Sequence, residues 1–192
     1  FMDVDTLTLS AIAGNGDGTF DIMTARSPLG GQYLSDILAV DYNGDDKTDL
    51  VLPTSGVAGS DGSPEEGTEG VLVLPGLGDF TFGQPTRVHE GVRTIWNGAA
   101  AADFNGDDRL DLAFATYAKP EPYTPNFGVT ILPNNGDGAF GPAVSELMPL
   151  GVTGSNSSLF ADDFNNDKAP DIVAGSGLAS PLLLNATGND KR

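Results

Sequence analysis

Three copies of one short pattern constrain the fold of this chain more than any other feature of its sequence. Each copy reads Asp-x-Asn-x-Asp-x-x-x-Asp, and the copies begin at Asp41, Asp103 and Asp163. They are spaced by about 60 residues, and a fixed period of that length is typical of solenoids, propellers and other repeat architectures. We therefore expect one supersecondary unit to recur along the chain.

The repeated positions carry oxygen side chains that can converge on one hard cation. Ca²⁺ takes about six to eight oxygen ligands, from carboxylates, amides and backbone carbonyls, at about 2.3–2.6 Å. Position seven of each loop would add its backbone carbonyl. The predicted ligands of the three Ca²⁺ sites are Asp41, Asn43, Asp45, Lys47 and Asp49; Asp103, Asn105, Asp107, Arg109 and Asp111; and Asp163, Asn165, Asp167, Ala169 and Asp171.

Two other interpretations of these loops can be compared with the calcium hypothesis. An EF-hand requires Glu at position twelve and flanking helices, but position twelve is Leu52, Phe114 or Ala174, and strand-like runs follow each loop. An Asx-rich turn without a metal is the second interpretation, because Asn, Asp and Gly are common in turns. Three copies with identical ligand spacing favour calcium loops within β-hairpins.

The repeats resemble a known family. The run from Asp103 to Asp107 followed by Asp111-Leu112 is similar to the FG-GAP/VCBS repeat of integrin α-subunit-type β-propellers. The turn at 14–20, its copy at 135–141 and a weaker copy at 78–83 are similar to that family's Gly-Asn-Gly-Asp-Gly-Thr-Phe turn.

Position six of the loops departs from the family, which usually has Gly there. This chain has Asp46, Asp108 and Lys168 at that position, and Asp can adopt the same turn. Lys168 places a cation beside the third loop, so the third site is predicted to be the weakest.

The strand-like runs and the resemblance together imply an all-β fold, a β-propeller of four-stranded antiparallel blades. Calcium loops would lie between strands A and B, and about three blades would be present. The composition agrees, because Gly and Pro make up 39 of the 192 residues and charged residues only 19%. A single partial propeller over 1–192 would comprise an outer hairpin at 1–30, blades at 31–91 and 92–150, and an incomplete blade at 151–192.

Propellers close with about four to eight blades. We therefore expect the remaining blades to come from the same gene product or from another subunit, or the chain to stack with copies of itself.

The net charge restricts the partners. The formal charge is −18, and three Ca²⁺ would reduce it to −12. Nucleic acid and anionic membranes are not expected partners at this charge. There is no run of 18 apolar residues that could span a membrane and no cysteine that could form a disulfide. Carboxylate sites of the extracellular class bind Ca²⁺ at about 10⁻⁴–10⁻³ M, which predicts a secreted or cell-surface location.

No catalytic residues are predicted. The only histidine is His89, which lacks a recognisable triad partner and is interpreted as a polar loop residue. The predicted function is a calcium-stabilised binding or adhesion module that recognises a glycan or a protein. The alternatives are an accessory or catalytic propeller of a larger secreted enzyme, of the polysaccharide lyase or lipase type, and a self-assembling structural surface protein.

Recognition is expected on the face opposite the calcium loops. Connections in an up-and-down blade alternate between its two ends, so the irregular segments 24–33, 54–70, 88–96 and 117–127 would share that opposite face. Binding residues are often found in irregular loops on a rigid scaffold. The resemblance implies the same face, because integrin-type propellers bind ligand on the face away from their calcium loops. The alternative role of the aromatic side chains in these segments is to shield the blade ends from solvent. The candidate ligand-binding residues are Tyr33, His89, Arg93, Tyr117, Tyr123 and Phe127.

Overall fold

The chain folds into β-strands joined by turns. The computed structural model describes residues 8–26, 32–57, 67–91, 94–118, 126–136, 138–147, 157–176 and 179–185. No helix occurs within these ranges, and none there could cross a membrane. The expected all-β fold class is thereby confirmed.

The strands are short and follow one another closely. In chain order they are β1 (Thr8–Gly14), β2 (Phe20–Arg26), β3 (Gln32–Leu34), β4 (Leu38–Val40), β5 (Asp49–Val57), β6 (Gly70–Leu74), β7 (Gly76–Gly78), β8 (Thr81–Phe82), β9 (Thr86–Glu90), β10 (Thr94–Ala102), β11 (Asp111–Ala118), β12 (Asn126–Leu132), β13 (Asn134–Gly136), β14 (Ala139–Phe140), β15 (Val144–Leu147), β16 (Ser157–Asp162), β17 (Asp171–Ser176) and β18 (Ala179–Asn185).

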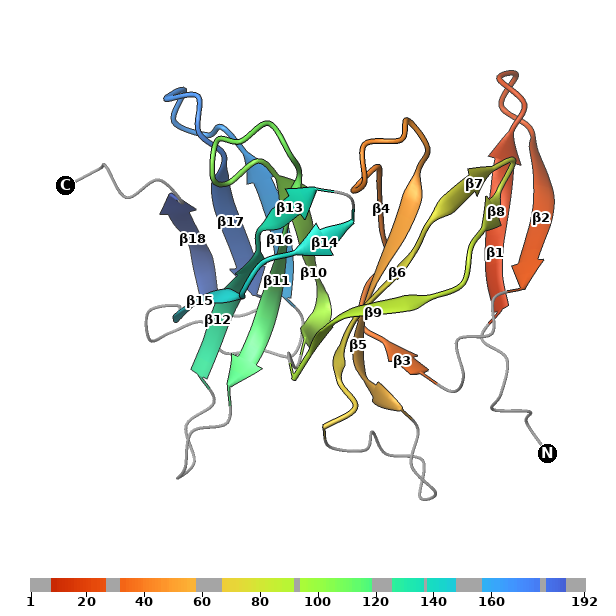
Figure 1. Ribbon diagram of the computed structural model, residues 1–192. Coiled ribbons are helices and arrows are strands. Elements are labelled where there is room, and N and C mark those ends of the chain that lie inside the picture. The colour runs from red at the N-terminus through yellow and green to blue at the C-terminus, as the bar shows by residue number, and fades with distance from the viewer. Residues whose placement is uncertain are drawn as a thin grey trace.

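Three antiparallel sheets form the body of the molecule (Figure 1). In the first sheet, β3 and β4 both pair with β5, which is followed by β6 and β9. The second sheet has the order β10-β11-β12-β15, and the third has β16-β17-β18. The pairs β1-β2, β7-β8 and β13-β14 are separate two-stranded hairpins.

Side chains on the inner strands alternate between two apolar cores, as the twofold period of a strand requires. In β5, Val51 belongs to a core shared with the second sheet, where Phe114 and Leu132 are also fully buried. Its neighbour Leu52 belongs to a core on the opposite face of the first sheet. Both faces of this sheet are therefore buried, which explains its continuous Val and Leu runs.

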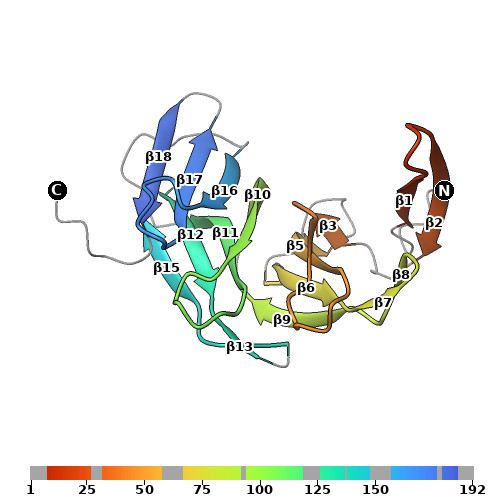
Figure 2. The same cartoon turned by 90° about the horizontal axis from the view of Figure 1, so that it is seen from above.

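A further core joins the second and third sheets. Ala113 and Val129 of the second sheet pack there with Leu159 and Ile172 of the third. The sheets thus stack face to face in chain order, and Figure 2 shows them following an arc with the β1-β2 hairpin at one end.

The outer strand of the first sheet is β9 and not the nearer run 80–82. The chain changes direction after β6, and β7-β8 forms a small hairpin before β9 pairs with β6. Pro75 explains the change, because it has no N–H to continue the ladder. Its carbonyl accepts the Gly83 N–H at 2.7 Å, which closes the base of the hairpin.

The second sheet repeats this arrangement. β14 and β15 follow β13, and only β15 pairs with β12, whereas β14 pairs with β13. The carbonyl of Pro133 accepts the Gly141 N–H at 2.7 Å, as in the first sheet. A proline followed by a small hairpin therefore occurs at the same place in the first and second sheets.

Candidate calcium loops

The three Asp-rich loops occupy the same position in the three sheets. They connect β4 to β5, β10 to β11 and β16 to β17, at the end of the sheets that also carries the β1-β2 turn (Figure 1). We call them the first, second and third loop. Their common place follows from the repeat, since each loop joins the first two adjacent strands of its sheet.

The first aspartate of each loop accepts hydrogen bonds from the loop backbone. In the second loop the N–H groups of Gly106 and Asp107 donate to Asp103 Oδ1 at 2.7 and 3.0 Å, and that of Asp108 donates to Oδ2 at 2.8 Å. The bond from position six to Oδ2 is 2.8 Å in the first loop and 2.9 Å in the third. Burial raises the pKa of Asp103, but hydrogen bonds from Asp108, Asp107, Gly106 and Asn105 outweigh it and hold the pKa below its ordinary value.

Two positions of each loop adopt left-handed backbone conformations. Position four is Gly44, Gly106 or Asn166, with φ of 76°, 78° and 62°. Position six has φ of 62°, 63° and 73° in the three loops, and its residues are Asp46, Asp108 and Lys168. The expectation that Asp adopts the turn at position six is confirmed. Lys168 does so without the local side-chain hydrogen bonding that favours Asp and Asn in this region.

The aspartate at position nine holds the first loop to the rest of its sheet. Asp49 is fully buried, and its carboxylate accepts the Tyr42 N–H at 3.2 Å and the Gly76 N–H at 2.6 Å. Burial raises the pKa of Asp49; the bonds from Gly76 and Tyr42 oppose this, while Asp45 and Asp41 add to it. The negative charge at this position is therefore only partly compensated.

The second loop has the same arrangement. Asp111 is fully buried, and it accepts the N–H of Asn134 at 2.7 Å and that of Phe104 at 3.1 Å. Burial raises its pKa against the effect of these two bonds, and the carboxylates of Asp107 and Asp103 raise it further. A divalent cation in the loop would relieve both the burial cost and the repulsion.

Position seven supplies a side-chain cation in the first two loops. Lys47 Nζ lies 3.0 Å from Asp45 Oδ2, and the Arg109 guanidinium pairs with Asp107. Arg109 Nε also donates to the Asn134 carbonyl at 2.8 Å. The sequence predicts only the backbone carbonyl of position seven as a ligand of the site. These side chains add an ion pair with the carboxylate at position five.

The third loop differs from both other loops at positions four, six and seven. Asp171 is buried and accepts the Phe164 N–H at 3.0 Å, as in the other loops. Position seven is Ala169, which has no cation, and the cation instead stands at position six in Lys168, whose N–H donates to Asp163. A lower calcium affinity at this loop remains a prediction.

The donor atoms of the loops suit Ca²⁺, although they are not gathered around a point. Among the described residues, no three acidic, His or Cys side chains form a ready-made metal site. The carboxylate oxygens instead accept backbone N–H groups, as shown for Asp41, Asp103 and Asp163. Oδ1 of Asp41 and of Asp103 each accept two N–H groups, whereas Oδ2 of the first aspartate in each loop accepts the N–H of position six and has a second lone pair for a metal. An amide and a backbone carbonyl complete an all-oxygen set. Calcium binding would therefore have to draw these oxygens together.

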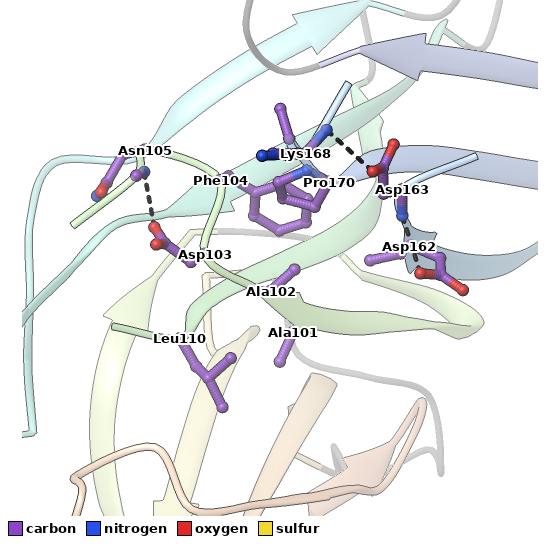
Figure 3. Close-up of a pocket in the computed structure, with 13 residues that line it drawn as sticks. Ala101, Ala102, Asp103, Phe104, Asn105, Leu110, Asp162, Asp163, Lys168 and Pro170 are labelled. Atoms are coloured by element: carbon purple, nitrogen blue, oxygen red, sulfur yellow. Dashed lines mark hydrogen bonds between the residues drawn. The ribbon is translucent and has the colours of Figure 1, made fainter. Parts of the chain in front are cut away.

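A cleft lies between the second and third loops. It has a volume of about 520 Å³, and Asp103 and Asn105 line it from the second loop. Asp163 and Lys168 line it from the third loop, and Figure 3 shows Phe104 and Pro170 between the two groups. The charges of two neighbouring loops therefore face one shared space.

Asn134 is a site residue that the sequence analysis missed. It is buried, and its Nδ2 donates to the Tyr42 carbonyl at 2.7 Å and to the Leu110 carbonyl at 3.1 Å. Its N–H donates to Asp111, so one residue connects the second loop with the first. In the sequence, the only signal for Asn134 is that it directly follows Pro133 at the end of a strand.

We predict that Gly76→Ala destabilises the protein by about 1–3 kcal/mol. A Cβ at this position would lie 2.1 Å from the Thr48 carbonyl oxygen, so the bond between Gly76 and Asp49 would have to move. Urea unfolding measures the effect. Gly83→Ala is the control, because its Cβ would lie 3.5 Å from Pro75, an ordinary contact. Equal costs for the two variants would contradict the role of Gly76.

The described parts of the predicted ligand-face segments lie largely in strands. Strand pairing extends further than expected, so β2 ends at Arg26, β10 begins at Thr94 and β11 ends at Ala118. This corrects the described parts of the predicted loop segments 24–33, 54–70, 88–96 and 117–127, since β5 likewise continues to Val57 and β6 begins at Gly70. Of the candidate residues, Tyr33 lies in β3, His89 in β9, Tyr117 in β11 and Phe127 in β12, while Arg93 and Tyr123 lie outside the described residues.

These strand positions lie away from the loops. Tyr117 and Phe127 are paired across β11 and β12, near the end of β11 opposite Asp111. His89 is paired with Val71 in the adjacent sheet, and burial lowers its pKa although Glu90 acts in the opposite direction. The interpretation of His89 as a loop residue was therefore wrong.

Comparison with known proteins gives no assignment. Neither the protein-family models nor the curated proteins include a match to this chain.

Proposed function

We propose that this protein is an extracellular calcium-binding module of the β-propeller type, which recognises a glycan through the strand ends opposite its calcium loops. One observation carries the calcium part of the proposal. The same loop, with the same hydrogen bonds and the same two left-handed positions, recurs in three successive sheets.

The propeller arrangement is supported by how the sheets pack. Successive antiparallel sheets share apolar cores face to face, in the order of the chain. The second sheet has four strands in sequential order, as an up-and-down blade requires. The arc in Figure 2 is the curvature expected of consecutive blades.

An extracellular setting follows from the proposed chemistry of the loops. The aspartates at position one are half-buried in all three loops, and those at position five are half-buried or exposed. No three acidic side chains of the described residues are gathered into a cage for a metal. Sites of this open kind bind Ca²⁺ at about 10⁻⁴–10⁻³ M, a concentration found outside cells. The loops would be filled there, and three ions would lower the net charge from −18 to −12.

The opposite strand ends offer aromatic side chains for recognition. Tyr33 is exposed in β3, and Tyr117 and Phe127 lie at the same end of the second sheet. Tyrosine presents an apolar ring and a hydroxyl together, and this combination suits the face of a sugar ring. The proposed role of His89 depends on its place in β9, and those of Arg93 and Tyr123 rest on the sequence alone.

The test measures binding of the protein to an immobilised glycan array in millimolar Ca²⁺. It compares wild type with variants at the calcium-loop end and at the opposite strand ends. We expect Tyr117→Ala combined with Tyr123→Ala to weaken glycan binding at least about tenfold, because aromatic contacts commonly dominate such interfaces. Calcium stoichiometry should be unchanged in that variant.

Asp107→Ala is the matched control at the loop end. It should lower calcium stoichiometry by one and leave glycan binding intact in the folded protein. Glycan binding that survives the double tyrosine change but is lost in Asp107→Ala would place recognition at the loops. No binding to any glycan would contradict carbohydrate recognition.

A further inference from the structure

The contacts between successive sheets follow one pattern. Two surfaces of the described residues expose side chains whose equivalents in that pattern are buried against a neighbouring sheet. Position two of the first loop is Tyr42, whose ring stacks on Phe140 of the following unit, with centroids 5.9 Å apart and an interplanar angle of 25°. Position two of the second loop is Phe104, which packs in the core shared with the third sheet. An aromatic at position two thus packs forward, onto the next sheet.

The hairpin turns supply the partner of this forward contact. Strand registers show that the turns are equivalent, since Asn134 pairs with Phe140, Gly76 with Phe82 and Gly14 with Phe20. Phe140 packs against the core between the first and second sheets, and Phe82 packs against the core on the opposite face of the first sheet. Phe20 is therefore the residue of the β1-β2 hairpin that should pack backward onto a preceding sheet.

The forward surface of the third sheet is open to solvent. Phe164 stands at position two of the third loop and is 48% exposed, whereas Tyr42 and Phe104 are 7% and 5% exposed. Phe160 in β16, three residues before its loop, is 62% exposed. Its equivalents Leu38 and Ala100 both pack in cores between sheets. We call Phe160 and Phe164 the forward face.

The backward surface of the β1-β2 hairpin is open as well. Phe20 is 65% exposed, and Ile12 is 61% exposed. Ile12 is equivalent by register to Leu74 and Leu132, which are both fully buried. We call Ile12 and Phe20 the backward face. The two faces lie at opposite ends of the arc in Figure 2.

We propose that the forward face of one copy of this chain binds the backward face of a second copy, through the same aromatic contact that joins its own sheets. Phe164 would take the place of Tyr42, and Phe20 of the second copy would take the place of Phe140. The occupant is a second copy because this chain displays both halves of the contact, one on each face.

Such an interface is heterologous, because two different surfaces meet. Heterologous contacts build closed rings or open filaments, in contrast to a twofold dimer in which one patch meets itself. The copies carry like charge, so association should strengthen when salt or bound Ca²⁺ screens the repulsion.

Sedimentation velocity of the full chain in millimolar Ca²⁺ tests the proposal, over about 1–100 µM protein. We expect the wild type to shift from monomer to larger species across this range. Phe164→Ser and Phe20→Ser should each raise the dissociation constant about ten- to a hundredfold. Leu77→Ser is the matched control, since Leu77 is equally exposed in β7 but belongs to neither face, and it should associate like wild type.

Mixing the two serine variants distinguishes a heterologous contact from other modes. Each variant retains one intact face, so an equimolar mixture should form a heterodimer although each variant alone remains monomeric. Circular dichroism spectra that match wild type would show that both variants are folded.

Three results would overturn the proposal. They are a wild-type protein that stays monomeric at about 100 µM, association that Leu77→Ser weakens as much as the two Phe variants do, and a mixture that stays monomeric. In the first case the forward face would have a different occupant, such as further sheets of a longer chain.

Discussion

Saturating Ca²⁺ is expected to raise the melting temperature of this protein by about 15–30 °C. A ligand at about a hundred times its dissociation constant stabilises the folded state by about 2.7 kcal/mol per site, so three sites supply about 8 kcal/mol. One kcal/mol corresponds to about 2–4 °C for a chain of this size. Differential scanning calorimetry with Ca²⁺ and with a chelator measures the difference.

The physical reason lies in the carboxylates of the loops. Asp49 and Asp111 are fully buried, and burial together with neighbouring carboxylates raises the pKa of each. Their ionised forms are therefore costly in the calcium-free protein, and a divalent cation reverses that cost. Mg²⁺ at the same concentration is the control. It should have a smaller effect, because it requires near-octahedral geometry and gives up its water reluctantly. A melting temperature unaffected by the chelator would contradict the prediction.

Replacing Asp111 by Ala is expected to cost about 2–6 kcal/mol even without calcium. The carboxylate accepts the buried N–H groups of Phe104 and Asn134, and an unsatisfied buried donor costs about 1–3 kcal/mol. Urea unfolding in a chelator isolates this structural contribution from any effect of the metal.

Asp107→Ala is the comparison, because its ion pair with Arg109 is partly exposed. Such pairs contribute about 1 kcal/mol or less, so this variant should be nearly as stable as wild type in the chelator. Both variants should lose the calcium stabilisation of one site. Equal stability of the two variants in chelator would show that Asp111 does not hold the loop.

The repeated features were predictable from the sequence because local chemistry determines them. Turn-forming residues set the left-handed positions of the loops, including Asp46 and Asp108 at position six. Short continuous runs of Val and Leu, bounded by turn residues, determine strands such as β5 and β6, so the all-β class and the antiparallel order followed.

The remaining features depend on contacts between distant segments. Asn134 reaches the Tyr42 carbonyl across 92 residues, and no local pattern encodes that bond. The choice of β9 over the 80–82 run as partner of β6 depends on where the hairpin after Pro75 closes. The exposure of Phe164 likewise depends on which sheet stands beside it, whereas the same position in the first loop is buried.

The number of calcium ions bound per chain tests the central claim most directly. Equilibrium dialysis up to about 10 mM Ca²⁺ covers the affinity range of open carboxylate sites. Three ions should bind to the wild-type chain, and Asp41→Asn, Asp103→Asn and Asp163→Asn should each reduce the number to two. The absence of saturable binding, or a number that these three substitutions leave unchanged, would contradict the account.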